Sequence, residues 1–127
     1  MRVLRISHSA VVADWRRRER HLLDLGADLR LVAARSWNEG GQVVELEPTD
    51  DGFVVGAATV GTHPFRFLFD PRPIWRELRR HPTDPIDILD IHEEPASLAA
   101  FEVRLLARLA RRRPAVVLYS AQNIVKR

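Results

Sequence analysis

Short, continuous apolar runs alternate along the chain with longer stretches in which apolar residues recur at helical spacing. Four runs are expected as strands buried on both faces: 3–7, 28–33, 86–91 and 115–119. Three amphipathic stretches are expected as helices: 14–26, 71–80 and 95–113. Strands that alternate with helices predict an α/β domain, with a Rossmann-like three-layer αβα architecture around a mostly parallel sheet.

A further pair of strands is expected between the second and third of these runs. Val43–Leu46 and Phe53–Ala57 flank a Pro-Thr-Asp-Asp-Gly sequence at 48–52. An Asp-Gly pair between two apolar runs favours a tight hairpin turn. The sequence therefore predicts a β-hairpin insertion here, preceded by a loop over 35–41 that its Asn and Gly residues indicate.

The helix expected over 95–113 has the clearest amphipathic pattern. Its larger apolar residues are expected to face the core: Leu98, Phe101, Leu105, Leu106 and Leu109. Its arginines are expected on the opposite face: Arg104, Arg108 and Arg111. For the helix over 14–26, Asp14 is expected as the N-cap and Gly26 as the stop, with Glu19, Leu22 and Leu23 on one side.

The composition is that of one globular domain. The chain has 127 residues, 46% of them hydrophobic and 29% charged, and no cysteine, so disulfides are excluded. No apolar run approaches the length of a membrane span, and the first residues are too charged for a signal peptide, so we expect a cytoplasmic protein. We also expect a single domain over 1–127 that lacks its closing helix and is therefore a truncated part of a larger fold.

The positive charge is carried almost entirely by arginine, and Lys126 is the only lysine. The arginines gather in two helical clusters: Arg16, Arg17, Arg18 and Arg20, and Arg104, Arg108, Arg111, Arg112 and Arg113. Solvated outer helix faces are the favoured interpretation. Peripheral contact with an anionic membrane at its inner face comes second, and nucleic acid is not expected as a partner, because no aromatic residues or reading motif accompany the charge.

Several common chemical motifs are missing. The chain has no Gly-rich dinucleotide fingerprint, no phosphate-binding Gly-Lys-Ser/Thr loop and no Gly-x-Ser-x-Gly elbow. Its five histidines lack the spacing of metal ligands, so no metal site and no cofactor are predicted.

Candidate ligand-binding residues follow the expected strands, because parallel sheets bind ligands beyond the carboxyl ends of their strands. We expect the strongest sugar-binding candidates to be Ser9, His92, Glu93, Gln122 and Asn123. Weaker candidates are His8, Trp37, Asn38, Gly40 and Gly41. Trp37 in an open loop would offer its ring to a sugar, although covering the loop is the commoner fate of such an aromatic residue.

Two stretches carry a resemblance to a known family. Asp87–Leu98 (DILDIHEEPASL) resembles the strand, His-Glu-Pro-type loop and Ser-capped helix of family 4 glycosyltransferases. Val116–Ile124 (VVLYSAQNI) is similar to that family's next strand and loop, which more often reads Thr-x-His-Asn or Thr-x-His-Asp. The resemblance covers essentially the whole chain, but only about the first third of such an enzyme.

The resemblance implies the amino-terminal, acceptor-side portion of a retaining hexosyltransferase with the GT-B fold. Its partners would be a nucleotide-sugar, bound mainly by a carboxyl-terminal domain that lies outside this chain, and a sugar or lipid-linked acceptor. This chain alone would be inactive, and no catalytic residue is assigned to it. Two departures weaken particular contacts: the first loop lacks the family's glycines, and Gln122 replaces a histidine, so it cannot titrate near neutral pH.

Two other interpretations stay open. The chain is alternatively a stand-alone, non-catalytic Rossmann-like binding or assembly module, or a basic protein that binds membrane surfaces. An unfinished sheet would expose an edge strand and an apolar face, so a homodimer is also a reasonable expectation.

Overall fold

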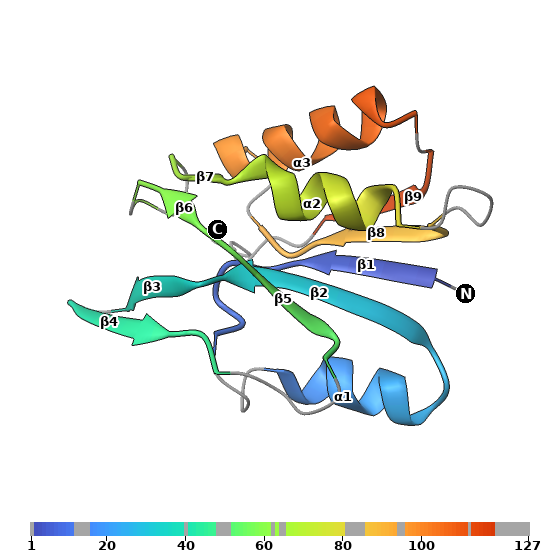
Figure 1. The fold of residues 1–127 in the computed structure, drawn as a ribbon, viewed down its shortest axis with the longest axis horizontal. Helices are drawn as coiled ribbons and strands as arrows, with labels where there is room; N and C mark the ends of the chain where they lie inside the picture. Colours follow the sequence, from blue (N-terminus) through green and yellow to red (C-terminus); the bar gives the residue numbers. More distant parts are fainter. Residues whose placement is uncertain are drawn as a thin grey trace, which may run out of the picture.

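The computed structural model describes residues 2–11, 16–39, 41–47, 52–61, 63, 66–80, 86–93, 96–111 and 113–118. These residues form an α/β fold around a five-stranded parallel sheet (Figure 1). Its strands, in spatial order, are β5 (Val54–Ala57), β2 (Asp28–Ala34), β1 (Arg2–Ile6), β8 (Ile88–Ile91) and β9 (Ala115–Leu118). The predicted α/β class with a mostly parallel sheet is therefore confirmed.

The strand order makes β1 the turning point of the sheet. The chain first builds outward from β1 through β2 to β5, and then returns to the other side of β1 with β8 and β9. In the register, Arg5 of β1 lies between Leu31 of β2 and Asp90 of β8. Doubly wound sheets bind ligands beyond the carboxyl ends of the two strands at which the strand order reverses. In this sheet those strands are β1 and β8.

Three helices cover the two faces of this sheet (Figure 1): α1 (Arg17–Asp24), α2 (Pro71–Leu78) and α3 (Leu98–Leu109). Helices α2 and α3 pack on one face, where Ile6, Leu89 and Ile91 are fully buried beneath them. Helix α1 lies on the other face, where Leu22 and Leu23 pack near Leu31. Consecutive strand residues point to opposite faces, so β1, β2 and β5 supply apolar side chains to both layers. The prediction that 115–119 is buried on both faces is wrong, because β9 lies at the edge of the described sheet and is exposed along its length.

The hairpin forms at a different place from the one predicted. β3 (Ser36–Glu39) pairs antiparallel with β4 (Gln42–Glu45), whereas Phe53–Ala57 contributes β5, which is parallel to β2. The turn lies between Glu39 and Gln42, where Gly41 has a φ of +90° and its N–H donates to Asn38 Oδ1 at 2.9 Å. A turn that needs a positive φ favours glycine. β4 therefore pairs with β3 through this turn, and not with Phe53–Ala57 through the Asp-Gly sequence at 51–52. The loop predicted over 35–41 is thus largely strand.

Two short strands complete the described elements, β6 (Thr59–Val60) and β7 (Leu68–Phe69), which pair antiparallel. They connect the carboxyl end of β5 to α2. The chain enters α2 through Asp70, whose side chain caps the helix by accepting from Arg72 N at 3.1 Å. Pro71 follows at the first helical position, where a missing N–H costs nothing.

The predicted inner face of α3 is wrong. The residues that this helix packs against the sheet are small: Ala99, Ala100, Val103, Ala107 and, just beyond the helix, Ala110. Phe101 and Leu109 are 65% and 61% exposed, and Leu98 and Leu105 are also exposed. A helix that approaches the sheet closely needs small side chains at the contact, so its larger apolar residues are left outside. Leu106 is half-buried beside the core.

Arg16, predicted on a solvated basic face, is buried instead. Its guanidinium donates to Ala10 O at 2.9 Å, Val11 O at 2.7 Å and Glu47 O at 2.6 Å. It therefore ties the segment after β1 to the segment after β4. Burial lowers the pKa of Arg16, and the carboxylates of Glu47 and Glu19 oppose that shift. Arg17 and Arg20 are exposed as expected, and Arg20 lies over the Phe53 ring.

Arg16→Lys is expected to lower the free energy of unfolding by about 1–3 kcal/mol, because a compact ammonium cannot reach at the same time the three carbonyls that surround the wider, planar guanidinium. Urea unfolding followed by circular dichroism measures the effect. Arg17→Lys on the exposed side of the same segment is the matched control and should change stability by less than about 0.5 kcal/mol. Equal effects of the two substitutions would contradict the bridging role of Arg16.

Asp70 gives a prediction about pH. The side chain and backbone N–H of Arg72 stabilise the ionised carboxyl and lower its pKa to about 2. A lowered pKa means that the carboxylate favours the folded state above its ordinary pKa, and that this contribution is lost as the pH falls through about 2. Arg72→Ala should raise the pKa of Asp70, measured by NMR titration of its carboxyl carbon. Arg76→Ala, one turn further on, should leave that titration unchanged, and an equal shift in both variants would contradict the assignment.

Candidate functional site

The candidate site lies where β1 and β8 end, at the turning point of the sheet. The backbone passes from β1 into Ser7 and His8, and from β8 into His92 and Glu93. Two backbone hydrogen bonds hold these ends in place: Ser7 N donates to Val32 O at 3.0 Å, and His92 N donates to Ile6 O at 2.8 Å. The strand ladders therefore continue for one residue past the strands and set the positions of the side chains that follow.

His8 and Glu93, 85 residues apart in the chain, meet at this position. Glu93 Oε1 lies 2.6 Å from His8 Nδ1, and Glu93 Oε2 accepts from the backbone N–H of His8 at 2.7 Å. The Glu93 side chain is 1% exposed and that of His8 is 16% exposed. A carboxylate only accepts, so His8 Nδ1 carries a proton, and the Nε2 atom of a neutral His8 ring is left as an acceptor or base.

Two aromatic rings pack against His8. The ring centroid of Trp37 lies 4.2 Å from that of His8, and the Phe67 centroid lies 5.0 Å from it. Trp37 and Phe67 also meet edge-on with centroids 4.9 Å apart. The imidazole is thus held between a carboxylate and an apolar wall. We call these four residues, His8, Trp37, Phe67 and Glu93, the switch-point cluster.

A group of buried charges lies beneath this position, between α1 and the sheet. Arg5 Nε is 2.5 Å from Glu19 Oε2, and Arg5 Nη1 is 3.2 Å from Asp90 Oδ2. Arg5 Nη2 also contacts His92 Nδ1. The side chains of Arg5 and Glu19 are 7% and 1% exposed. We call Arg5, Glu19, Asp90 and His92 the buried charge cluster.

The contact with Arg5 determines the tautomer of His92. A guanidinium is always a donor, so His92 Nδ1 accepts, and the ring proton lies on Nε2. In its neutral form His92 therefore carries its ring proton on Nε2, whereas neutral His8 carries its ring proton on Nδ1 and has an acceptor at Nε2. A hydroxyl group is a partner of the kind that such an acceptor takes.

The remaining predicted residues have varied positions. Ser9 is half-buried in the loop after β1, with its Oγ 3.4 Å from Ser7 Oγ. Trp37 belongs to β3 and is 6% exposed, so its ring forms a wall beside His8 rather than an open stacking surface. Asn38 is exposed and its side chain holds the turn at Gly41. Gly40, Gln122 and Asn123 lie outside the described residues.

Some residues of the site were missed from sequence. Phe67 lies in a stretch, 66–70, to which the sequence assigns no element, so nothing marks it as a wall of the site. Arg5 and Asp90 interrupt two otherwise apolar strands, and Glu19 lies on the apolar side of its helix. A charged residue within a buried strand needs a buried partner, so these interruptions were the available signal.

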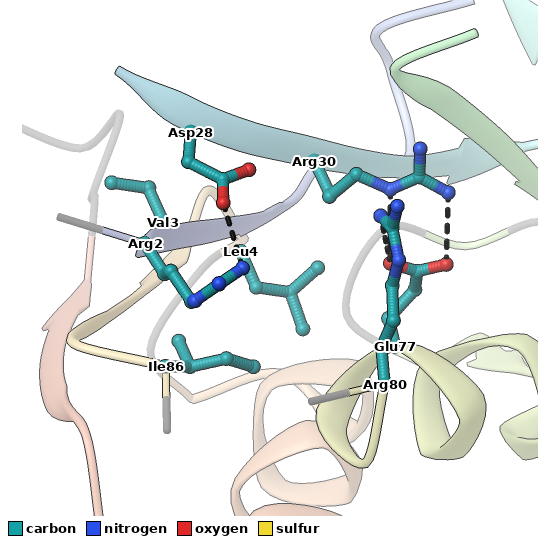
Figure 2. A pocket seen from close by; sticks show the side chains of 8 residues that line it. All are labelled: Arg2, Val3, Leu4, Asp28, Arg30, Glu77, Arg80 and Ile86. Carbon is teal, nitrogen blue, oxygen red and sulfur yellow. Dashed lines mark hydrogen bonds and ion pairs between the residues drawn. The ribbon is translucent and has the colours of Figure 1, made fainter. Parts of the chain in front are cut away.

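A second recess lies at the opposite, amino-terminal end of β1 and β2 (Figure 2). Its charges are already paired: Arg2 with Asp28 at 2.7 Å, and Arg30 with the two Glu77 oxygens at 3.0 and 3.1 Å. The enclosed space is about 20 Å³, which suits a single water molecule. The pair between Arg30 of β2 and Glu77 of α2 connects the helix to the sheet, so we interpret this recess as a structural feature and not as a binding site.

Two further observations concern metals and membranes. Among the described residues, no three histidine or carboxylate side chains are grouped as metal ligands would be. None of the described helices is both long enough and apolar enough to cross a bilayer.

Comparison with known proteins gave no match, whether to a protein family, to a curated protein or to a solved structure.

Proposed function

We propose that this chain forms the acceptor-binding, amino-terminal portion of a retaining glycosyltransferase that takes its sugar from a nucleotide-sugar donor. The observation that carries the proposal is the contact between His8 and Glu93 at the turning point of the sheet. Doubly wound sheets bind ligands at this position. The resemblance of 87–98 and 116–124 to family 4 glycosyltransferases supplies the class of reaction.

The hydrogen-bonding character of the site supports a sugar-like ligand. His8 offers an acceptor, and the half-buried Ser9 adds a hydroxyl that both donates and accepts. Glu93 fixes the His8 ring by two contacts, and such preorganised groups lower the cost of orienting a flexible polyol. In this proposal His8 accepts a hydrogen bond from an acceptor hydroxyl, and Glu93 is the positioning residue.

The proposal does not place the nucleotide-sugar donor on this chain, because the chain lacks a turn suited to binding its phosphates. A nucleotide diphosphate is commonly held by a glycine-rich turn whose backbone N–H groups approach the phosphates closely. The segment after β1 has no glycine between His8 and Ala13. The proposal therefore places the nucleotide on a carboxyl-terminal domain, which would also supply most of the electrostatic stabilisation of the leaving diphosphate.

The test uses the complete protein encoded by the reading frame that contains this chain. Transfer is assayed with UDP-glucose, UDP-N-acetylglucosamine and GDP-mannose against a panel of simple glycoside acceptors. His8→Ala should raise the acceptor KM about tenfold, the effect of losing one hydrogen bond in a partly buried site, and should leave the donor KM nearly unchanged.

His21→Ala is the matched control, because His21 is exposed on α1 and far in sequence from the site. It should leave both KM values unchanged. The proposal is overturned if no donor is consumed with any acceptor, or if His8→Ala behaves like His21→Ala. The first result would favour a non-catalytic binding or assembly module instead.

A further inference from the structure

The outer face of α3 carries an apolar stripe. Leu98, Phe101, Leu105 and Leu109 follow one another at spacings of three or four residues, which places them on one side of the helix. Their exposed fractions are 47%, 65%, 43% and 61%. Large exposed apolar residues that lie next to one another mark an interaction surface rather than ordinary surface variation.

Arginines border this stripe. Arg104 and Arg108 are exposed on α3, and together with Phe101 and Leu105 they line a groove of about 240 Å³. Helix α2 lies beside α3 on the same face of the sheet (Figure 1) and presents further exposed basic and aromatic groups. A second hollow, of about 440 Å³, is lined by Pro71, Arg72, Trp75, Arg76 and Leu106. We call the exposed side chains of these two helices the α2–α3 outer surface.

The charge of this surface is strongly positive. Of the seven arginines in the segments 71–80 and 98–111, Arg80 lies beside Glu77 in the recess of Figure 2, and the other six are Arg72, Arg76, Arg79, Arg104, Arg108 and Arg111. The two acidic residues of these segments point away from the outer surface. Glu77 is buried against Arg30, and the half-buried Glu102 accepts from Phe69 N at 2.8 Å. Asp70, just before α2, is paired with Arg72.

We propose that the α2–α3 outer surface binds an anionic phospholipid bilayer. A helix face that places leucine and phenylalanine between arginines suits the boundary between headgroups and acyl chains, where the apolar residues enter the bilayer and the arginines contact phosphate. Trp75 is 37% exposed and stands beside Arg72 and Arg76, an arrangement typical of residues at the membrane interface. The inference does not rest on the proposed glycosyltransferase function.

Charge decides between the bilayer and two other occupants. A second copy of this chain, docked symmetrically, would bring two positively charged surfaces together, and like charges across an interface are unfavourable. A nucleic acid would satisfy the arginines but would leave Phe101 and Leu109 in water. An anionic bilayer satisfies both the charge and the apolar stripe.

The experiment is co-sedimentation of the complete protein encoded by the reading frame that contains this chain with vesicles of phosphatidylcholine alone and of phosphatidylcholine with phosphatidylglycerol. Binding should be strong only with the anionic vesicles and should fall when salt is added. Phe101→Ser with Leu105→Ser, and separately Arg104→Gln with Arg108→Gln, should each weaken binding about tenfold or more. All four side chains are exposed, so the variants should keep the fold.

Matched controls remove the same kinds of group elsewhere. Leu25→Ser with Val60→Ser removes two other exposed apolar residues, and Arg17→Gln with Arg66→Gln removes two other exposed charges. Both control variants should bind as the wild type does. The proposal is overturned if the chain does not bind anionic vesicles, if controls and test variants bind alike, or if duplex DNA binds as tightly and the serine variant keeps that affinity.

Discussion

Arg5→Met is expected to lower the free energy of unfolding by about 3–5 kcal/mol, the cost of breaking a buried ion pair and leaving its partner charged. The Arg5 side chain is 7% exposed and faces Glu19, whose side chain is 1% exposed. Methionine fills much of the same volume, so the loss is electrostatic rather than a matter of packing. Urea unfolding monitored by circular dichroism measures the difference.

Two further variants isolate the cause. Arg2→Met removes another arginine of β1, but its pair with Asp28 is partly exposed, so the change should cost less than about 1 kcal/mol. Arg5→Met combined with Glu19→Met should recover only part of the lost stability, because it removes the Glu19 carboxylate but keeps Asp90, the second carboxylate that Arg5 contacts. If Arg5→Met costs no more than Arg2→Met, the buried charge cluster does not stabilise the fold as described.

Glu93→Gln is expected to reverse the tautomer of His8. The wild-type carboxylate accepts at 2.6 Å from His8 Nδ1, so the proton lies on that nitrogen. A glutamine that keeps its oxygen on the His8 backbone N–H turns its NH₂ group toward Nδ1, which then has to accept. Long-range ¹H–¹⁵N NMR spectra distinguish the two tautomers directly.

The same substitution should weaken ligand binding at His8. Nε2 changes from an acceptor to a donor, so the hydrogen bond that neutral His8 accepts from a ligand hydroxyl is lost, which is worth about 0.5–1.5 kcal/mol, or up to about tenfold in affinity. Glu45→Gln is the matched control, because Glu45 is exposed on β4. If His8 keeps its proton on Nδ1 in Glu93→Gln, then Glu93 does not orient the ring.

The class of fold follows from the sequence because its signals are strong and local. Apolar runs such as 28–33 become buried strands where helices cover both faces, and the amphipathic stretch 71–80 closely predicts α2 (Pro71–Leu78). The run 115–119 gives a similar signal, but β9 is exposed, because burial depends on what covers the strand. The pairing of β4 was not predictable in the same way. Two turn signals, at 40–41 and 51–52, compete for it, and only the three-dimensional contact of β5 with β2 decides between them.

The orientation of α3 shows a second limit. Periodicity identifies an apolar face but cannot tell which of two apolar faces is inside, and this helix has an alanine-rich face and a leucine-rich face. The closeness of the helix to the sheet selects the small residues. For the site, sequence placed His8 and Glu93 at the ends of their strands, but it ranked His8 low, because the partnership across 85 residues is a property of the fold.

The most direct test of the central claim, that the ends of β1 and β8 bind a sugar-like ligand, is NMR titration of the ¹⁵N-labelled chain. The probes are methyl glycosides of glucose, mannose and galactose, added to tens of millimolar because the proposed function makes this chain only one half of a two-domain site, and half a site binds weakly. The claim predicts that signals of Ser7, His8, Ser9, His92 and Glu93 shift together with one probe and that His8→Ala abolishes the shifts. No shift at these residues with any probe, or unchanged shifts in His8→Ala, would contradict it.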